Sequence, residues 1–448
     1  MSTAPAPTET PIQDRPAELL ARLLRFDTTN PPGNERECIE WVRGLLAQLG
    51  CEVRLVAAEP ERPCLIARLE GEGSSPPLLL QGHVDVVAAR GSWTRPPFGG
   101  EQHDGYIWGR GALDMKGGVA MMLAAFMRAK AAGRRPPGDV ILCLMADEEA
   151  GSALGAEFLV REHPELFAGV RYSIGELGGF RMDVAGRAFY PVMVAEKQIC
   201  WTLATFRGRT GHGSMPVAGG AMSALGRLLT RIDSRRLPVH VPAVTRMMVD
   251  AIAAELPAAL AVPLRGLLRP RITDRVLDAL GERGRTFDPL LHNTVSATIV
   301  RGGEKINVIP GEVSAELDIR LLPGSTPAQA FDELRELAGV EVELEVIRHY
   351  AAPAVPDMAM FDRLAGVLRE LDSDAKAVPL LLPGVTDGRF FSKLGIQTYG
   401  FLPMSLPEDF DFYSSIHAAD ERVPVAALDF GADAVYKVLQ RFGAAEGT

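Results

Sequence analysis

The segments that constrain this fold most are short apolar runs that end in glycine or in charged side chains. Leu78–Leu80 leads into His83, and the run at 139–145 leads into an Asp-Glu-Glu sequence at 147–149. Continuous apolar runs of this length are typical of strands buried on both faces of a parallel sheet. Because the carboxyl ends of parallel strands meet at one edge of the sheet, we expect these polar side chains to gather there.

The order of the predicted elements divides the chain into two domains, since 448 residues exceed one ordinary core. Strands alternate with helices over 1–195 and again over 350–448. This pattern predicts one discontinuous α/β domain, a mixed and mainly parallel sheet flanked by helices. Residues 196–349 carry longer strands with one open face. They predict an inserted α+β, ferredoxin-like domain with an extra helical segment at about 237–290.

The composition excludes some classes of function. A net charge of −10 and a pI near 5.5 leave no basic surplus for phosphates, which argues against a nucleic-acid partner. No apolar run reaches the roughly 18–20 residues of a membrane-spanning helix, so no membrane partner is expected. The five cysteines are scattered and none forms a CxxC pair, which indicates reduced packing residues. We therefore expect a cytoplasmic protein.

Histidine and carboxylate side chains recur where the predicted strands end. They are His83, Asp85, Asp114, Glu148, Glu149, Glu176 and His417. Taken one at a time, each has an ordinary structural explanation, such as an acidic loop or a histidine satisfied in the core. Gathered at one sheet edge, so many carboxylates require cations. The mixture of imidazole and carboxylate suits zinc, and the number of carboxylates indicates two metal ions.

A series of segments extends this pattern to a known family. They are GHVDVV, WGRGALDMKGG, DEEAGS, SIGELGG, RGRTGHGSMP, INVIPGEVSAELDIRLLPG, PGVTDGRFF and SSIHAADERV. In this order, and over nearly the whole chain, they resemble the dizinc amidohydrolase and metallopeptidase family. That family includes aminoacylase, acetylornithine deacetylase, succinyl-diaminopimelate desuccinylase and the Gly-X carboxypeptidases.

The resemblance implies a dinuclear metal site with two Zn²⁺ per chain, and Co²⁺ or Mn²⁺ are alternatives. His83 and Glu176 would hold one ion. Glu149 and His417 would hold the other, and Asp114 would bridge both.

The resemblance also assigns residues around the ions. Asp85 would accept a hydrogen bond from the far ring nitrogen of His83 and so orient the ring. Glu148 would be the general base. The family pattern further predicts a cis peptide bond between Asp114 and Met115.

The inserted domain would act as a lid and dimerisation domain and supply most of the substrate side. The residues implied there and in a nearby loop are His212, Asn307, Arg320 and Gly384. His212 would stabilise the oxyanion, in cis or across a dimer interface, and its alternative is a turn residue in a glycine-rich hairpin. Arg320 suits a free carboxylate. Its alternative is an ion pair on the strand surface with Asp318 or Glu316.

The resemblance implies metal-dependent hydrolysis of an amide bond next to a free carboxylate, of the carboxypeptidase or aminoacylase type. The substrate would be an N-acyl amino acid or a short peptide. An acetylornithine deacetylase or desuccinylase type of deacylase is one alternative, and an inactive metal-binding homologue is another. The inserted domain argues against the single-domain dizinc aminopeptidases. A homodimer paired through that domain and a monomer are both open.

Overall fold

The structure, a computed structural model, describes residues 10–216 and 218–443. The ends of the predicted catalytic domain, 1–9 and 444–448, lie outside the described residues, as does position 217. The fold divides into two compact units. Unit 1 comprises the described residues of Met1–Val194, Asp357–Pro379 and Thr386–Thr448, and unit 2 comprises those of Ala195–Pro356 and Leu380–Val385.

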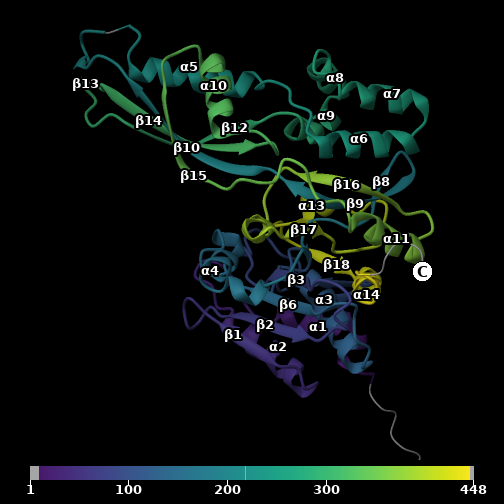
Figure 1. The fold of residues 1–448 in the computed structure, drawn as a ribbon. Helices are drawn as coiled ribbons and strands as arrows, with labels where there is room; N and C mark the ends of the chain where they lie inside the picture. The colour runs from purple at the N-terminus through teal and green to yellow at the C-terminus, as the bar shows by residue number, and fades with distance from the viewer. Residues whose placement is uncertain (1–9, 217, 444–448) are drawn as a thin grey trace, which may run out of the picture. The chain divides into compact units, whose positions relative to one another are not determined.

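Unit 1 is built on a large mixed sheet (Figure 1). The strand order is β1-β2-β6-β3-β7-β17-β9-β16, and β8 pairs with β9. The parallel central strands are β6 (Val140–Met145), β3 (Leu78–His83), β7 (Tyr172–Gly175) and β17 (Gln397–Gly400). The remaining strands are β1 (Val53–Val56), β2 (Cys64–Leu69), β8 (Met182–Val184), β9 (Arg187–Glu196) and β16 (Lys376–Leu382). The last residues of β9 and β16 are assigned to unit 2.

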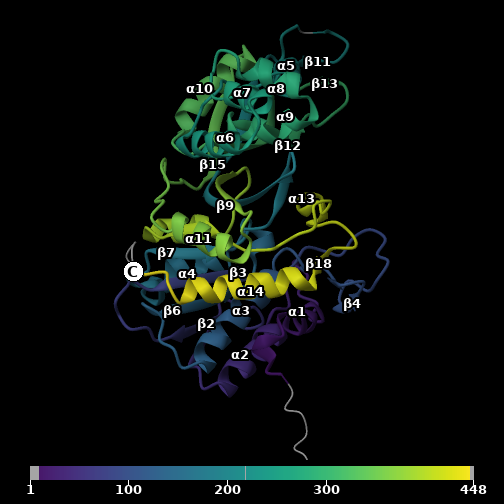
Figure 2. The ribbon, with the colours of Figure 1, turned by 90° about the vertical axis from the view of Figure 1, so that its right-hand side faces the viewer.

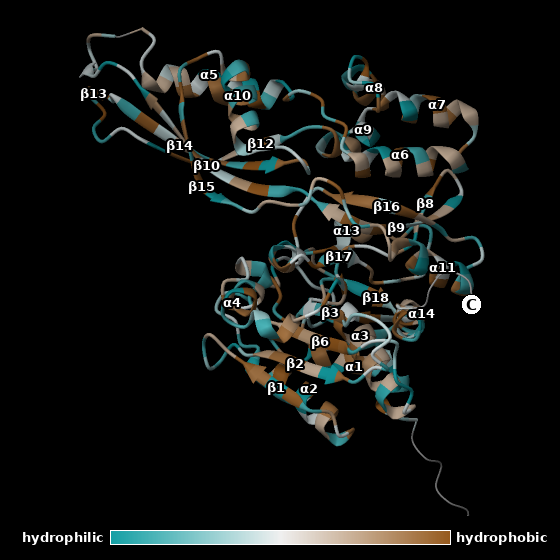
Figure 3. Ribbon diagram, viewed as in Figure 1, coloured by the Kyte–Doolittle hydropathy of each residue, from teal (hydrophilic) through white to brown (hydrophobic). Residues whose placement is uncertain are grey.

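Helices flank this sheet, and the apolar content of each helix determines how much of it is buried. They are α1 (Pro16–Leu24), α2 (Arg36–Gln48), α3 (Lys116–Ala131), α4 (Ala156–Glu162), α11 (Phe361–Leu371), α12 (Gly388–Phe391), α13 (Phe412–Ser415) and α14 (Val425–Leu439). Helix α3 is apolar nearly all round, so it packs against β3 and β6 and is covered by α1 and α14. Figure 2 shows α14 along α3, and Figure 3 shows the apolar character of β2 and β6.

A second, smaller sheet of unit 1 lies beside the candidate site. It is formed by β4 (Glu101–His103), β5 (Tyr106–Trp108) and β18 (Arg422–Pro424), in the order β18-β5-β4. Strands β5 and β18 are antiparallel, with Trp108 opposite Arg422. This pairing joins segments from the first and last quarters of the chain.

Unit 2 contains a four-stranded antiparallel sheet in the order β12-β14-β10-β15. Its strands are β10 (Gln198–Arg207), β12 (Thr294–Gly302), β14 (Glu312–Leu321) and β15 (Glu343–His349), and its packed helices are α5 (Ala221–Ser234) and α10 (Pro327–Ala338). The hydrophobic residues of β14 alternate with polar ones, so one face of the sheet is buried under these helices.

Two further parts of unit 2 stand apart from that core. A small two-stranded antiparallel sheet pairs β11 (Gly211–His212) with β13 (Val308–Ile309), which lie far apart in the sequence. A helical segment comprises α6 (Ala243–Glu255), α7 (Ala258–Gly266), α8 (Thr273–Leu280) and α9 (Glu282–Phe287), and it has its own cluster around Leu267, Leu277 and Leu291.

The predicted fold class, a mixed α/β sheet flanked by helices together with an α+β part, is confirmed. All five cysteines are free, and four of them are buried. Among residues 10–216 and 218–443, no helix combines the length and apolarity that crossing a membrane requires.

Candidate metal centre

Three neighbouring parallel strands of unit 1 end at the candidate site. His83 is the last residue of β3, and Glu176 follows β7 directly. After β6 the chain turns through Asp147, which has a φ of 73°, into a short 3₁₀ turn over Glu148–Ala150. Because β6, β3 and β7 are adjacent and parallel, their ends bring these side chains to one edge of the sheet.

The expected ligands form two groups that share Asp114. One Asp114 oxygen lies 3.2 Å from His83 Nε2, and the other lies 3.2 Å from His417 Nε2. His83 Nε2 is also 3.5 Å from Glu176, and His417 Nε2 is 3.2 Å from Glu149. The structure therefore brings all five sequence-predicted ligands together, with the Asp114 carboxylate between the two imidazoles. The cis peptide bond predicted between Asp114 and Met115 is confirmed.

The charges in this cluster fit a bound cation. Burial and the nearby Asp114 charge raise the pKa of Glu176 to about 8. Burial also raises the pKa of Glu148 well above its usual range, and the Glu176 carboxylate adds to that shift. Hydrogen bonds to Asp114 and Glu149 raise the pKa of His417 to about 10. Buried carboxylates that oppose each other's ionisation, next to imidazole nitrogens, are a donor set that suits zinc.

Glu148 lies within the same cluster. Its ligand atom and those of His83 and Glu176 all lie within 4.8 Å of one another, as do those of His83, Asp114 and Glu149. The geometry therefore places the Glu148 carboxylate beside the predicted ligands, within reach of the same space.

Asp85 contacts His83 and also the turn after β6. His83 Nδ1 lies 3.0 Å from the backbone carbonyl oxygen of Asp85, whereas the nearest carboxylate oxygen is 3.6 Å away. The carboxylate instead accepts the backbone N–H groups of Glu148 and Glu149, each at 3.1 Å. The backbone carbonyl of Asp85 is therefore the nearer partner of the His83 ring, and the Asp85 carboxylate lies beside that ring while it holds the turn after β6.

A buried polar network that the sequence analysis missed continues from Asp85. Asn30 Nδ2 donates to Asp85 at 2.9 Å and to Asp147 at 3.1 Å. Arg62 Nη1 donates to Asp147 at 3.1 Å, and its Nη2 donates to Glu35 at 2.6 Å. No local pattern marks these residues, since their partners lie far away along the chain.

Arg389 is the cation nearest to Glu148 among the described ion pairs of this site, with Nη1 at 3.7 Å from Glu148 Oε1. It is held by the carbonyl of Thr386 and by Ser152, which also donates to Asp387. The segment at 386–389 thus lies beside the Glu148 carboxylate within unit 1.

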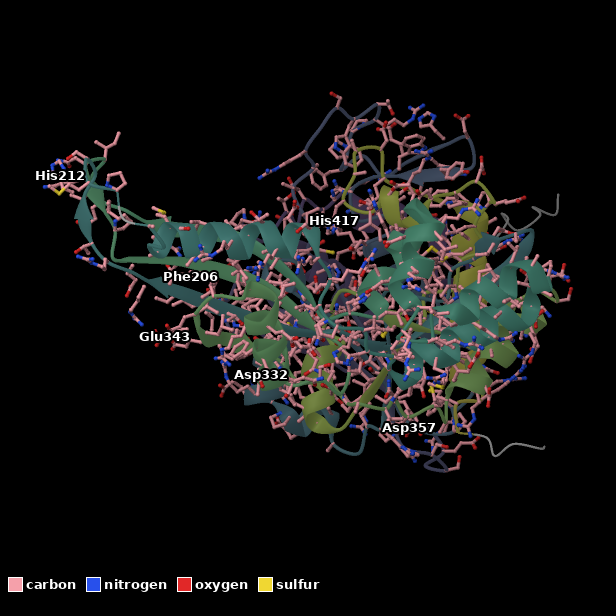
Figure 4. The ribbon with its side chains drawn as sticks, turned by 90° about the horizontal axis from the view of Figure 1, so that it is seen from above. Phe206, His212, Asp332, Glu343, Asp357 and His417 are labelled. Atoms are coloured by element: carbon pink, nitrogen blue, oxygen red, sulfur yellow. The ribbon has the colours of Figure 1, made fainter. Side chains whose placement is uncertain are left out.

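The substrate-side residues predicted from the sequence belong to unit 2. His212 and Asn307 adjoin each other at the two-stranded β11–β13 sheet, where Gly213 N donates to the Asn307 carbonyl at 2.8 Å. Figure 4 shows His212 at the tip of unit 2, beyond Phe206 of β10. The Ser214 backbone N–H donates to His212 Nδ1 at 3.2 Å, so in the neutral ring the hydrogen is on Nε2.

Arg320 and Gly384 are the other two residues that the sequence predicts on the substrate side. Both guanidinium nitrogens of Arg320 that face Asp318 donate to it, at 2.7 and 3.0 Å. This is the strand-surface ion pair that was the alternative to carboxylate binding. Gly384 lies in the segment Leu380–Val385 of unit 2, and a Cβ there would meet only Leu382.

Comparison with known proteins places this arrangement in a family. The model of Peptidase family M20/M25/M40 matches residues 79–441. Aminoacylase-1 of Homo sapiens is 27% identical over 96% of this chain and 96% of its own length. "Probable carboxypeptidase S-like 2" of Dictyostelium discoideum is 28% identical over 78% of this chain and 68% of its own.

Solved structures share the fold. A metallo-carboxypeptidase of the M20 family, Sso-CP2 from Sulfolobus solfataricus, has a TM-score of 0.63 at 18% identity and covers 96% of this chain and 99% of its own. The di-peptidase Dug1p from Saccharomyces cerevisiae has a TM-score of 0.64 at 16% identity, with 97% of each chain covered. The chain therefore belongs to Peptidase family M20/M25/M40 and is a hydrolase of that family.

Proposed function

We propose that this protein hydrolyses the amide bond next to a free carboxylate in an N-acyl amino acid or a short peptide. One observation carries the proposal: the Asp114 carboxylate lies between two imidazole–carboxylate pairs, with Glu148 beside them. Aminoacylase-1 and the carboxypeptidase relatives are named for reactions of this type.

The metal would be zinc, with two ions per chain. His83 and Glu176 would hold one ion, Glu149 and His417 the other, and Asp114 both. When bound, a pair of zinc ions supplies a water of lowered pKa and positive charge for the oxygen of the scissile carbonyl. The similar M20 structure from Bacillus subtilis is titled a dinuclear metal binding peptidase.

Glu148 would be the proton carrier. Its carboxylate takes a proton from the attacking water and later gives it to the nitrogen of the leaving amine. Burial favours the first of these steps, because it raises the pKa of Glu148 well above its usual range and so makes the carboxylate a better proton acceptor. Arg389, 3.7 Å away, orients the carboxylate.

The inserted unit would supply the substrate side and act as lid and dimerisation domain. Since Ser214 donates to His212 Nδ1, His212 Nε2–H is available as a donor to the developing oxyanion. Asn307, on the neighbouring strand, and Gly384 would contact the substrate. Arg320 would bind the substrate carboxylate only by sharing its guanidinium with Asp318. The free state of the cysteines supports a cytoplasmic location.

The test is a panel of dipeptides and N-acyl amino acids, each paired with its carboxamide. We expect hydrolysis of the free acids, and a loss of at least tenfold in kcat/KM when the carboxylate is capped. Equal rates for acid and amide would contradict recognition of a free carboxylate. Preference for N-acetylornithine over every dipeptide and N-acyl hydrophobic amino acid would favour the deacylase alternative.

A further inference from the structure

A buried ion pair outside the ligand set joins the two segments that supply Asp114 and His417. Arg110 and Glu421 are each 1% exposed, and Arg110 Nη1 donates to Glu421 Oε2. The two residues lie 311 positions apart. Unit 1 therefore brings together the loop after β5 and the turn before β18 through side chains that contact neither imidazole.

Glu421 organises the backbone of the Asp114 loop. Its Oε1 accepts the N–H groups of Leu113 at 2.7 Å and of Asp114 at 3.2 Å. Its Oε2 accepts the N–H of Gly111 at 3.1 Å, as well as Arg110. The loop can turn this tightly because Gly111 has a φ of 89°, and a Cβ there would lie 2.7 Å from Val86 Cγ1. The carboxylate thus holds the peptide unit of Asp114 directly.

Arg110 holds the other segment. Its Nη2 donates to the backbone carbonyl of His417 at 3.0 Å, so one guanidinium contacts both Glu421 and His417. His417 itself has a φ of 61°, in the left-handed region that few non-glycine residues adopt. The Gly109 N–H donates to the Glu421 carbonyl at 2.9 Å and extends the β5–β18 ladder to this point.

We propose that Arg110 and Glu421 form a positioning clip that sets the spacing between the Asp114 carboxylate and the His417 imidazole. The inference rests on the proposed function, because it concerns the cation held on the His417 side. His83 and Glu176 are positioned by their own strands, β3 and β7, so the cation on their side depends less on the clip.

The other explanation of the pair is purely structural. A buried carboxylate can satisfy loop amides and stabilise the fold without affecting cation affinity. The two explanations differ in what happens to cation binding when stability falls, and the experiment has to separate these two quantities.

The test uses metal-free full-length protein titrated with Co²⁺ alone. Visible absorption and calorimetry report how many ions bind and how tightly. The variants are Glu421→Gln, which replaces an acceptor oxygen by a donor, and Arg110→Lys, which keeps the charge but loses the fork that reaches both partners. Leu46→Ala on α2, buried and remote in sequence from both loops, is the stability control.

We expect Glu421→Gln to bind the first ion with wild-type affinity and the second roughly 10- to 100-fold more weakly, as for other residues that orient metal ligands. Its one-ion spectrum should match that of His417→Ala and differ from that of His83→Ala. Leu46→Ala should bind both ions normally despite a lowered Tm. If Glu421→Gln does not fold, Arg110→Lys carries the test, with a smaller weakening of the same ion.

Two results would overturn the inference in distinguishable ways. If wild-type protein takes up two Co²⁺ ions and Glu421→Gln or Arg110→Lys takes them up equally tightly, the clip is wrong and the proposed function stands. If wild-type protein takes up none, the proposed metal site fails and the clip fails with it.

Discussion

At the scale of single residues, burial and neighbouring charges separate the roles of nearby carboxyl groups. Burial alone would raise the pKa of Asp114, but hydrogen bonds from His417 and His83 lower it below its usual range. Glu148, which lacks such donors from imidazole, has its pKa raised by burial and by the Glu176 charge. The result is one carboxylate that stays ionised between two imidazoles and one that can carry a proton.

Replacement of Glu148 by Gln tests its assignment as the base. We expect kcat to fall by roughly 10²–10⁴-fold, the usual contribution of a general base. We also expect the metal content to stay at the wild-type value, because the other ligands remain. Metal analysis beside steady-state kinetics checks both. Since Glu148 also lies within 4.8 Å of the His83 and Glu176 ligand atoms, loss of an ion would reassign it as a ligand.

The burial of Lys197 in unit 2 predicts that the free energy of unfolding depends on pH. It is 1% exposed and donates to the His292 carbonyl and to Thr294. Burial, together with the nearby Arg320 charge, lowers its pKa to about 7. The unfolded chain, with a lysine pKa of about 10.4, binds a proton that the folded chain does not bind between these values. Burial of the Lys197 amine therefore lowers the free energy of unfolding by its full amount below pH 7. This loss becomes smaller as the pH rises toward about 10.4.

The measurement is chemical unfolding of wild type and Lys197→Met at pH 6.5 and 9.5. We expect the free energy of unfolding of Lys197→Met, relative to that of wild type, to be higher at pH 6.5 than at pH 9.5, by on the order of a few kcal/mol. Lys305→Met, at an exposed lysine of the same unit, is the control and should show the same difference at both values. A Lys197→Met difference that does not change with pH would contradict the lowered pKa.

The burial and the partners of individual side chains were the hardest features to predict from the sequence. His103, His163, His240, His292 and His349 fit no motif and are expected at the surface. That expectation is wrong for His292, which is 1% exposed and lies between Asp288 and Asp274. Arg320 forms an ion pair with Asp318, which is the alternative that the sequence offered to binding a free carboxylate. Contacts of this kind depend on which element folds over the side chain.

At the scale of elements, the turn after β6 depends on a buried ion pair that links it to α2 and β2. Arg62 lies between Glu35 and Asp147, and Glu35 is fully buried. Replacing Arg62 by Met leaves the Glu35 carboxylate without its cation. We expect a loss of about 3–5 kcal/mol in the free energy of unfolding, as for other buried pairs with one partner removed.

The double variant Glu35→Gln/Arg62→Met is the matched comparison. It removes both charges, so it should recover a substantial part of the stability lost in Arg62→Met. Urea unfolding of both variants in the presence of a chelator isolates this effect from metal binding. Equal stability of the single and double variants would show that the Glu35 charge is not the cause.

Elements with a strong local pattern were predictable. The apolar runs at Leu78, at 139–145 and at Tyr172 form β3, β6 and β7, because a strand buried on both faces is apolar throughout. The expected helical segment at 237–290 contains α6 to α9. Strands β4, β5 and β18 were missed, since each has three residues and exists through pairing with a distant partner.

At the scale of the whole molecule, we expect stability and metal binding to be coupled. The cluster around Asp114 collects buried carboxylates from several parts of unit 1, and cations that bind only the folded chain stabilise it. We expect removal of metal by a chelator to abolish hydrolysis and to lower the Tm. Re-addition of Zn²⁺ should restore both. At a free Zn²⁺ concentration of 100 times Kd, the free energy of unfolding should rise by about 2.7 kcal/mol.

A scanning calorimetry series in increasing free Zn²⁺ provides the measurement. Asp114→Ala, which lacks the shared carboxylate, is the control and should show little Zn²⁺ dependence of its Tm. Hydrolysis that continues unchanged after exhaustive chelation would refute the metal dependence.

The sequence by itself determined the α/β class and which residues stand at strand ends. These follow from local periodicity and from the apolar length of each strand, which neighbouring residues set. Only the tertiary structure decided that the Asp85 carbonyl contacts His83, that Arg62 reaches Asp147, and that Arg110 and Glu421 meet. Those contacts join residues whose proximity depends on the packing of the whole unit, so no local pattern encodes them.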